Sequence, residues 1–222
     1  MTTKQWRGWT FPATEKHLIE WMAQVGDVRR GRPVYQGRKY DAALALTRRR
    51  RMAVDIGANV GLWSWLMAHD FEQLHAFEPV PAYAECWRAN VQGTGVHLHQ
   101  LALGEAPGRA RMVCGTEGSC GDTTVDVGQG GAIVGEDVEV RTLDSYCFND
   151  VDLVKCDNEG FEVFVMRGAA QTLQRCRPVV IVEQKPGHGK AFGLPDDAAV
   201  QFLRTLGMQV QNVIAGDYIL TF

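Results

Sequence analysis

Short apolar runs alternate through the middle of the chain with segments of helical periodicity. The apolar runs predict buried strands at residues 52–56, 73–77, 96–103, 152–157 and 178–184. The segments between them predict helices at residues 62–68, 82–90 and about 160–175. Because strands and helices alternate, the pattern predicts a parallel sheet with right-handed crossover connections.

The pattern changes on both sides of this region. Asp41 is positioned to cap a short helix that runs through AALAL. Residues 138–146 show strand alternation, and residues 208–222 predict two strands around an Ala-Gly-Asp turn, which is short enough for a hairpin. Residues 115–135 contain seven glycines and few large side chains, so we expect a mobile loop there.

These elements predict an α/β fold of the Rossmann-like, doubly wound type, with a mostly parallel sheet and a C-terminal antiparallel hairpin. A chain of 222 residues is long enough to bury a substantial core. We expect two parts: a basic helical N-terminal extension over residues 1–50, and the main domain over residues 51–222.

Composition excludes several classes of protein. Apolar residues make up 45% of the chain and charged residues 22%, which excludes a largely disordered chain. The chain has no apolar signal segment at its start and no run near the roughly 18 to 20 apolar residues that cross a bilayer, so we expect a cytoplasmic protein. The six cysteines form no C-x-x-C pair, which argues against a zinc site or a thioredoxin-type motif.

Charge is unevenly distributed. The net charge is -3, yet residues 1–51 contain 12 of the 23 Lys and Arg residues. The basic positions include Arg29, Arg30, Arg32, Arg38, Lys39 and Arg48 to Arg51. Such a segment can bind an anionic acceptor, but arginine runs are often a solvated face and no RRM-like aromatic signature accompanies them. A nucleic-acid partner is therefore the less favoured alternative.

The stretch AVDIGANVG, residues 53–61, carries the most specific signal for chemistry. A glycine-bearing turn between a first strand and a helix is the usual place for a nucleotide cofactor in this type of sheet. Glu78 lies 21 residues after Gly57, where an acid typically binds ribose hydroxyls. Asn59 occupies the position of the glycine that approaches a pyrophosphate, so a cofactor without pyrophosphate is favoured over NAD.

S-adenosylmethionine meets these conditions. We expect Gly57 to allow the tight turn and close approach of the methionine moiety, and Gly61 to let the helix pack near the strand. Asp55 is placed to organise the turn and the cofactor's amino group. The predicted cofactor-binding residues are Asp55, Gly57, Ala58, Asn59, Gly61, Glu78, Pro79, Leu103 and Asp157. The simpler alternative is that residues 53–61 form a tight strand-to-helix connection that binds no ligand. The position of Glu78 makes this alternative the less favoured one.

Six motifs in order resemble the FkbM-type S-adenosylmethionine-dependent methyltransferases. They are DIGANVG, AFEPVP, RTLDSY, VKCDNEGFE, the Gly-Ala pair at 168–169, and PVVIVEQ. The match covers about residues 50–185, and the chain's small size and closing GDYIL look like compact members from phage and environmental genomes. The resemblance implies the seven-stranded methyltransferase fold and methyl transfer to oxygen, often on a sugar or polyketide hydroxyl. Asn158 departs from the family's small apolar residue within D-x-E-G, which leaves the choice of acceptor open.

The catalytic residues should lie beyond the carboxyl ends of the strands. Asp157 is our first choice for the base that removes the acceptor's proton or for orienting the acceptor. Glu159 is expected either to act there or to cap the following helix. Glu183 is expected to bind acceptor hydroxyls or to help Asp157 hold a divalent ion, although the spacing is too loose to predict a metal. His188 is either a second base or, more simply, a solvated loop residue.

The sequence thus predicts a methyltransferase that acts on a hydroxyl of a saccharide or similar small polar acceptor. Leu103 is expected to pack on the adenine ring, or to be plain core. Asp122, Thr123 and Thr124 are expected to close over the cofactor, or to form a surface loop without a role. The remaining alternatives are a nucleic-acid methyltransferase, a non-catalytic binding module with a methyltransferase-like fold, and an NAD-dependent oxidoreductase.

Overall fold

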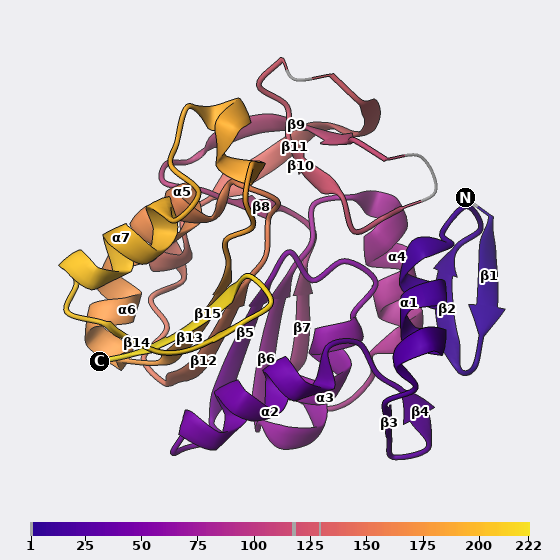
Figure 1. Ribbon diagram of the computed structural model, residues 1–222, viewed down its shortest axis with the longest axis horizontal. Helices are drawn as coiled ribbons and strands as arrows, with labels where there is room; N and C mark the ends of the chain where they lie inside the picture. Colours follow the sequence, from indigo (N-terminus) through magenta and orange to yellow (C-terminus); the bar gives the residue numbers. More distant parts are fainter. Residues whose placement is uncertain (1, 117–118, 129) are drawn as a thin grey trace.

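The computed structural model describes residues 2–116, 119–128 and 130–222. Among these residues, seven strands form the main sheet (Figure 1). In spatial order they are β14 (Gln209–Ile214), β15 (Asp217–Thr221), β13 (Val179–Glu183), β12 (Val151–Cys156), β5 (Met52–Ile56), β6 (Gln73–Phe77) and β7 (Val96–His99). The strands from β13 to β7 pair in parallel, whereas β15 is antiparallel to both β13 and β14. The predicted Rossmann-like sheet and its C-terminal hairpin are therefore confirmed.

Helices cover both faces of this sheet because the strands are apolar on both sides. The helices on one face are α2 (Gly37–Leu46), α3 (Leu62–Asp70) and α4 (Pro81–Asn90). Those on the other are α5 (Glu162–Arg167), α6 (Ala170–Cys176) and α7 (Ala198–Thr205). In β5 the side chains alternate, with Val54 and Ile56 packed beneath α5 to α7 and Ala53 beneath α2 and α3.

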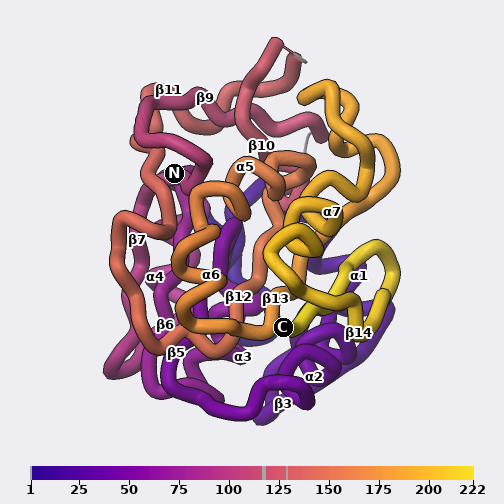
Figure 2. The backbone as a smooth tube through the Cα atoms, turned by 90° about the vertical axis from the view of Figure 1, so that its left-hand side faces the viewer, coloured from indigo at the N-terminus to yellow at the C-terminus, as the bar shows by residue number. Residues whose placement is uncertain are grey.

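A smaller sheet lies beyond the carboxyl ends of the main strands, at the top of Figures 1 and 2. It contains β8 (Ala102–Leu103), β9 (Gly108–Cys114), β10 (Thr123–Val125) and β11 (Ala132–Arg141). The prediction of one strand over 96–103 was wrong. The Leu101 N–H bonds to the His99 carbonyl in a tight turn, and β8 then pairs with β11 instead of β6.

The glycine-rich stretch 115–135 was expected to be a loop. The described part of it includes β10 and the start of β11, which both pair with β9. Residues 117, 118 and 129 of this stretch lie outside the described residues. The helix predicted over 160–175 is two helices, α5 and α6, with Gly168 and Ala169 between them.

The first fifty residues are only partly helical, which corrects the prediction of a helical extension. They form the hairpin of β1 (Thr3–Trp6) and β2 (Trp9–Pro12), helix α1 (His17–Val25), a second hairpin of β3 (Val28–Arg29) and β4 (Arg32–Pro33), and α2. Each hairpin turns through an Arg-Gly pair with positive φ at both residues, Arg7-Gly8 and Arg30-Gly31. Two consecutive positive φ values define the tight turn that matches the twist of antiparallel strands.

This N-terminal segment packs into the rest of the molecule. Trp9 and Phe11 are fully buried in a cluster that also contains Leu62 from α3 and Cys86 from α4. The Asn90 side chain bonds both backbone groups of Thr10 and the carbonyl of Val60. Asp41 lies inside α2 and pairs with Arg29, so it is not a helix cap. No helix of the described residues is long and apolar enough to span a membrane.

Candidate functional site

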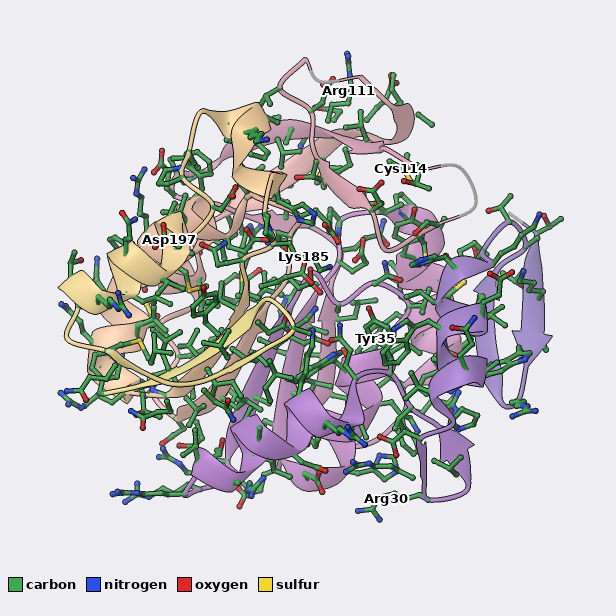
Figure 3. The ribbon with its side chains drawn as sticks, in the orientation of Figure 1. Arg30, Tyr35, Arg111, Cys114, Lys185 and Asp197 are labelled. Carbon is green, nitrogen blue, oxygen red and sulfur yellow. The ribbon has the colours of Figure 1, made fainter. Side chains whose placement is uncertain are left out.

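A cavity of about 390 Å3 opens at the carboxyl ends of β5, β6 and β12, beneath the smaller sheet. Sequence-predicted residues in its wall are Gly57, Ala58, Asn59, Glu78, Pro79, Leu103, Asp157, Glu159 and His188. Asp55, Gly61 and Glu183 lie just behind the wall. The N-terminal segment contributes His17, Leu18 and Tyr35, and Figure 3 labels Tyr35 and Lys185, which both line the cavity.

The turn after β5 depends on two glycines. Gly57 has φ of +72°, and a Cβ there would lie 2.0 Å from the Asp157 carbonyl oxygen. Gly61 has φ of +92°, and a Cβ there would lie 2.6 Å from a methyl group of Val91. Only glycine fits both the backbone conformation and the space. The turn after β5 therefore touches the turn after β12, and α3 packs closely against α4.

Glu78 holds this turn in place from the end of β6. Its two carboxylate oxygens accept hydrogen bonds from the Asn59 N–H at 2.7 Å and the Val80 N–H at 2.8 Å. Burial raises the pKa of Glu78 to about 7, although both backbone bonds oppose the shift. Each oxygen retains a second lone pair, so Glu78 can also accept a bond from a ligand hydroxyl in the cavity.

Asn59 connects the turn to the segment that covers the cavity. Its side-chain amide donates to the Cys120 carbonyl at 2.6 Å. The Thr124 hydroxyl donates to the Asn158 carbonyl at 3.1 Å. We name residues 119–125 the cover segment; Asp122, Thr123 and Thr124 lie in it and line the cavity. Asn59 has φ of +53°, a conformation that asparagine tolerates better than most residues.

Lys155 is a site residue that sequence reasoning missed. Its ammonium donates to the Gly57 carbonyl at 2.9 Å and lies 3.5 Å from Asp55 and 3.8 Å from Asp157. Burial opposes its charge, but the two carboxylates outweigh burial and raise its pKa. Asp55 is fully buried and also accepts a bond from the Ser64 hydroxyl at 2.6 Å. Asp55 therefore helps to hold Lys155 in its place at the cavity.

Three carboxylates meet at the ends of β12 and β13. Burial, together with the charges of Asp157 and Glu159, raises the pKa of Glu183 to about 10. Burial also raises the pKa of Glu159, while His188 opposes the shift. At Asp157 burial is outweighed by the ammonium groups of Lys155 and Lys185, which hold its pKa below the ordinary value. Near neutral pH the site therefore combines an ionised Asp157 with a protonated Glu183.

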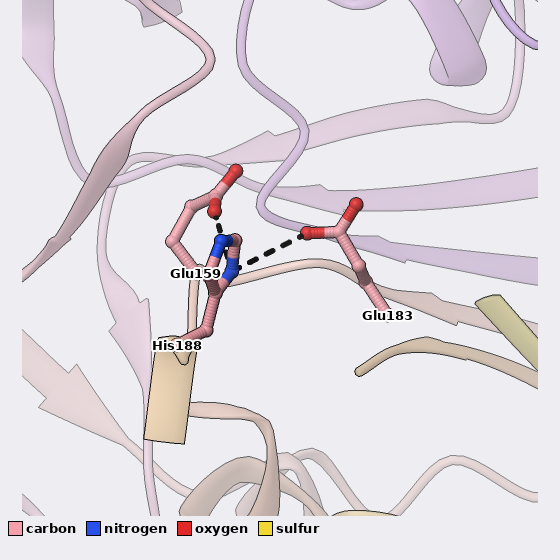
Figure 4. Close-up of side chains that lie close together, drawn as sticks. All are labelled: Glu159, Glu183 and His188. Carbon is pink, nitrogen blue, oxygen red and sulfur yellow. Dashed lines mark ion pairs between the residues drawn. The ribbon is translucent and has the colours of Figure 1, made fainter. Parts of the chain in front are cut away.

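Gly160 brings His188 to this cluster. Its φ is +102°, and a Cβ there would lie 2.3 Å from the His188 carbonyl oxygen. The His188 ring then reaches Glu159, with Nδ1 2.9 Å from a carboxylate oxygen, as Figure 4 shows. This bond raises the pKa of His188 above its ordinary value. His188 is therefore partly exposed but paired with Glu159, and its role as a second base stays a prediction.

Glu162 binds the turn that precedes α5, whereas no side chain caps this helix among the described residues. Its carboxylate accepts bonds from the N–H groups of Asn158 at 2.8 Å and Gly160 at 3.0 Å. It is 1% exposed, and burial raises its pKa to about 7. Glu159 has no capping bond and faces the cavity with a φ of +52°.

Leu103 is part of the core, and its packing on the adenine ring stays a prediction. It is 2% exposed within the core cluster, and its remaining surface faces the cavity.

The basic N-terminal residues are largely engaged within the protein. Arg29 pairs with Asp41, and Arg51 pairs with Asp150 and Asp152. Lys39 forms a buried pair with Asp217 at 2.9 Å. Arg32 stacks on Trp9 with its guanidinium 3.5 Å from the ring centre. These contacts engage Arg29, Arg32, Lys39 and Arg51, whereas Arg38, Arg48 and Arg49 are exposed.

The cavity is built around a glycine-bearing turn at the carboxyl edge of a doubly wound sheet. This arrangement is typical of α/β enzymes that bind a nucleotide cofactor. Comparison with known proteins specifies the class further. Residues 55–210 match the model of the methyltransferase FkbM domain. The chain therefore belongs to the FkbM methyltransferase family. This match identifies residues 55–210 as a methyltransferase FkbM domain, as the sequence analysis predicted.

Two solved structures support the fold. A methyltransferase FkbM from Methylobacillus flagellatus KT superposes with a TM-score of 0.50 at 16% identity, over 80% of this chain and 45% of that one. The chain thus spans under half the length of that protein. A protein from Streptococcus mutans in complex with SAH superposes with a TM-score of 0.51 at 11% identity, over 83% of this chain and 94% of that one. No curated protein matches the chain in sequence.

Proposed function

We propose that this domain transfers the methyl group of S-adenosylmethionine to a hydroxyl of a saccharide or similar small polar acceptor. The observation that carries the proposal is the arrangement of the cavity wall. The glycine turn and Glu78 lie on one side, and the ionised Asp157 lies beside Glu159 and His188 on the other. Such a wall offers a cofactor subsite next to a group that accepts a proton.

The residues of the glycine turn and Glu78 suit S-adenosylmethionine. Gly57 lines the cavity at the proposed methionine position, and its missing Cβ leaves room for the Asp157 carbonyl. Ala58 and Asn59 complete this turn, and Glu78 with Pro79 borders the ribose position. Leu103 offers an apolar surface for adenine. Asp55 and Gly61 act from behind the wall, Asp55 by holding Lys155 and Gly61 by positioning α3.

The bound cofactor supplies an electrophilic methyl group on a sulfonium. In-line displacement requires the acceptor oxygen, the methyl carbon and the sulfur to be aligned. A hydroxyl must lose its proton as the new bond forms. Asp157 is the base in this proposal, because Lys155 and Lys185 keep it ionised and it lies on the cavity wall.

Glu159 and Glu183 form the acceptor side of the same proposal. The pKa of Glu183 is raised to about 10, so this residue can donate as well as accept hydrogen bonds, and Glu159 adds a further carboxyl group at the cavity wall. This pair suits an acceptor with several hydroxyls. The apolar part of the wall, with Tyr35, Trp63 and Phe161, suits the carbon face of a sugar ring.

The experiment uses S-adenosylmethionine with a labelled methyl group and panels of saccharides, RNA and DNA. We expect label on saccharide hydroxyls. Asp157→Asn should lower the turnover rate about 100- to 10,000-fold, the range for loss of a general base, while cofactor affinity changes little. The control is Asp137→Asn, an exposed acid outside the cavity wall. Label on nucleic acid alone, or an unchanged rate in Asp157→Asn, would contradict the proposal.

A further inference from the structure

Glu159, Glu183 and His188 present ligand atoms that all lie within 4.8 Å of one another. The three side chains converge in Figure 4 from the turn after β12, the end of β13 and the segment after β13. His188 Nδ1 is 2.9 Å from a Glu159 oxygen and 3.9 Å from Oε2 of Glu183. Two ligand atoms of one tetrahedral ion with bonds of about 2.1 Å are about 3.4 Å apart. The two separations measured from His188 Nδ1 lie on either side of that value.

A second observation is independent of this clustering. Glu183 is 3% exposed, and its Oε2 has no hydrogen-bond partner among the described residues. A buried oxygen without a partner is costly, and this one faces the space between Glu159 and His188. Its other oxygen pairs with the ammonium of Lys185 at 2.5 Å. Lys185 is 39% exposed along its side chain, so it can move to solvent and leave Glu183 to another cation.

We propose that Glu159, Glu183 and His188 bind a divalent first-row transition-metal ion such as Mn2+ or Zn2+. One imidazole nitrogen with two carboxylates suits these ions, whereas Mg2+ and Ca2+ prefer oxygen ligands alone. Three protein ligands leave a coordination position for a further oxygen. The ion lies beside Asp157 at the cavity, where that position suits an acceptor hydroxyl. The role of the ion rests on the proposed function, whereas its binding does not.

Binding is measured on the metal-free protein with no cofactor or acceptor present, by titration with Mn2+ observed by electron paramagnetic resonance and with Zn2+ by calorimetry. We expect one ion per chain. Glu183→Gln and His188→Gln should each weaken metal binding by more than about tenfold, because mutation of a residue that only supports a metal ligand already lowers the affinity by that factor. Lys185→Met should tighten binding severalfold, because it removes a competing cation.

Matched controls are Glu105→Gln and His69→Gln, which alter exposed residues outside the cluster. Both should bind like the wild type, and thermal melting should show that every variant is folded. Absence of Mn2+ and Zn2+ binding would overturn the inference, as would binding that is indifferent to Glu183→Gln and His188→Gln. S-adenosylmethionine titrated into the same samples separates the two proposals, because the cofactor subsite is on the other side of the cavity.

Discussion

At the scale of single residues, Gly57 controls how closely the turns after β5 and β12 approach. Its missing Cβ lets the Asp157 carbonyl and the Asn158 side chain reach the turn. Lys155 then bonds the Gly57 carbonyl from the adjacent strand. One glycine therefore determines the positions of both the proposed cofactor turn and the proposed base.

We predict that Gly57→Ala lowers the free energy of unfolding by several kcal/mol more than Gly26→Ala. The two glycines have similar φ, +72° and +66°, but a Cβ at Gly26 meets nothing within 4 Å. Gly26→Ala should therefore cost only the conformational penalty, about 1 to 2 kcal/mol. Urea unfolding of both variants measures the difference, and equal losses would show that the close approach to Asp157 is unimportant.

The sequence predicted site residues where a local motif exists. Gly57 and Glu78 follow from the order of strand, glycine turn, helix and strand, and the structure brings them together at the cavity. Lys155 and Glu162 have no such signal, because their partners come from other segments or depend on the turn's three-dimensional shape. The pairing of His188 with Glu159 was not predicted, because only the fold brings Gly160 against the His188 backbone.

At the scale of elements, the cover segment links the two turns that border the cavity. Asn59 bonds the Cys120 carbonyl, and Thr124 bonds the Asn158 carbonyl. The sequence predicted flexibility here from glycine content. Strand pairing between β9, β10 and β11 joins residues far apart in the sequence, and periodicity does not predict such pairing.

We predict that Asn59→Gly loosens the cover segment without unfolding the protein. Glycine accepts the positive φ of this position, so the main change is the loss of side-chain hydrogen bonds. Each is worth about 0.5 to 1.5 kcal/mol, so amide exchange in residues 119–125 should accelerate about 2- to 10-fold. Asn212→Gly, which removes an exposed side-chain bond in β14, should leave that exchange unchanged. Unaltered exchange in Asn59→Gly would contradict the linking role.

At the scale of the whole molecule, the mostly parallel sheet and its C-terminal hairpin followed from hydrophobic periodicity, whereas the number of strands followed from the family resemblance. The same stacking of strands creates a titratable feature that periodicity does not reveal. His75 of β6 stacks on His97 and His99 of β7 and on Phe148. Burial, and then the two neighbouring histidines, lowers the pKa of His75 to about 4.

We predict that this cluster reduces stability in acid. The folded protein keeps His75 neutral to about pH 4, whereas the unfolded chain binds the proton near pH 6.5. The contribution of neutral His75 to the free energy of unfolding is therefore complete above about pH 6.5 and is lost as the pH falls toward 4. His75→Phe should show a smaller loss of unfolding free energy between pH 7 and 4.5 than the wild type. Parallel pH dependences of the two proteins would contradict the prediction.

The most direct test of the account is calorimetric titration with S-adenosylmethionine and with its demethylated product. We predict micromolar-range binding of both ligands to the wild type. Binding should weaken at least about tenfold in Glu78→Ala, which removes a carboxylate from the cavity, and should persist in the exposed control Glu105→Ala. Thermal melting shows whether each variant is folded. If the folded wild type binds neither ligand, the assignment of this cavity to the methyl donor is wrong.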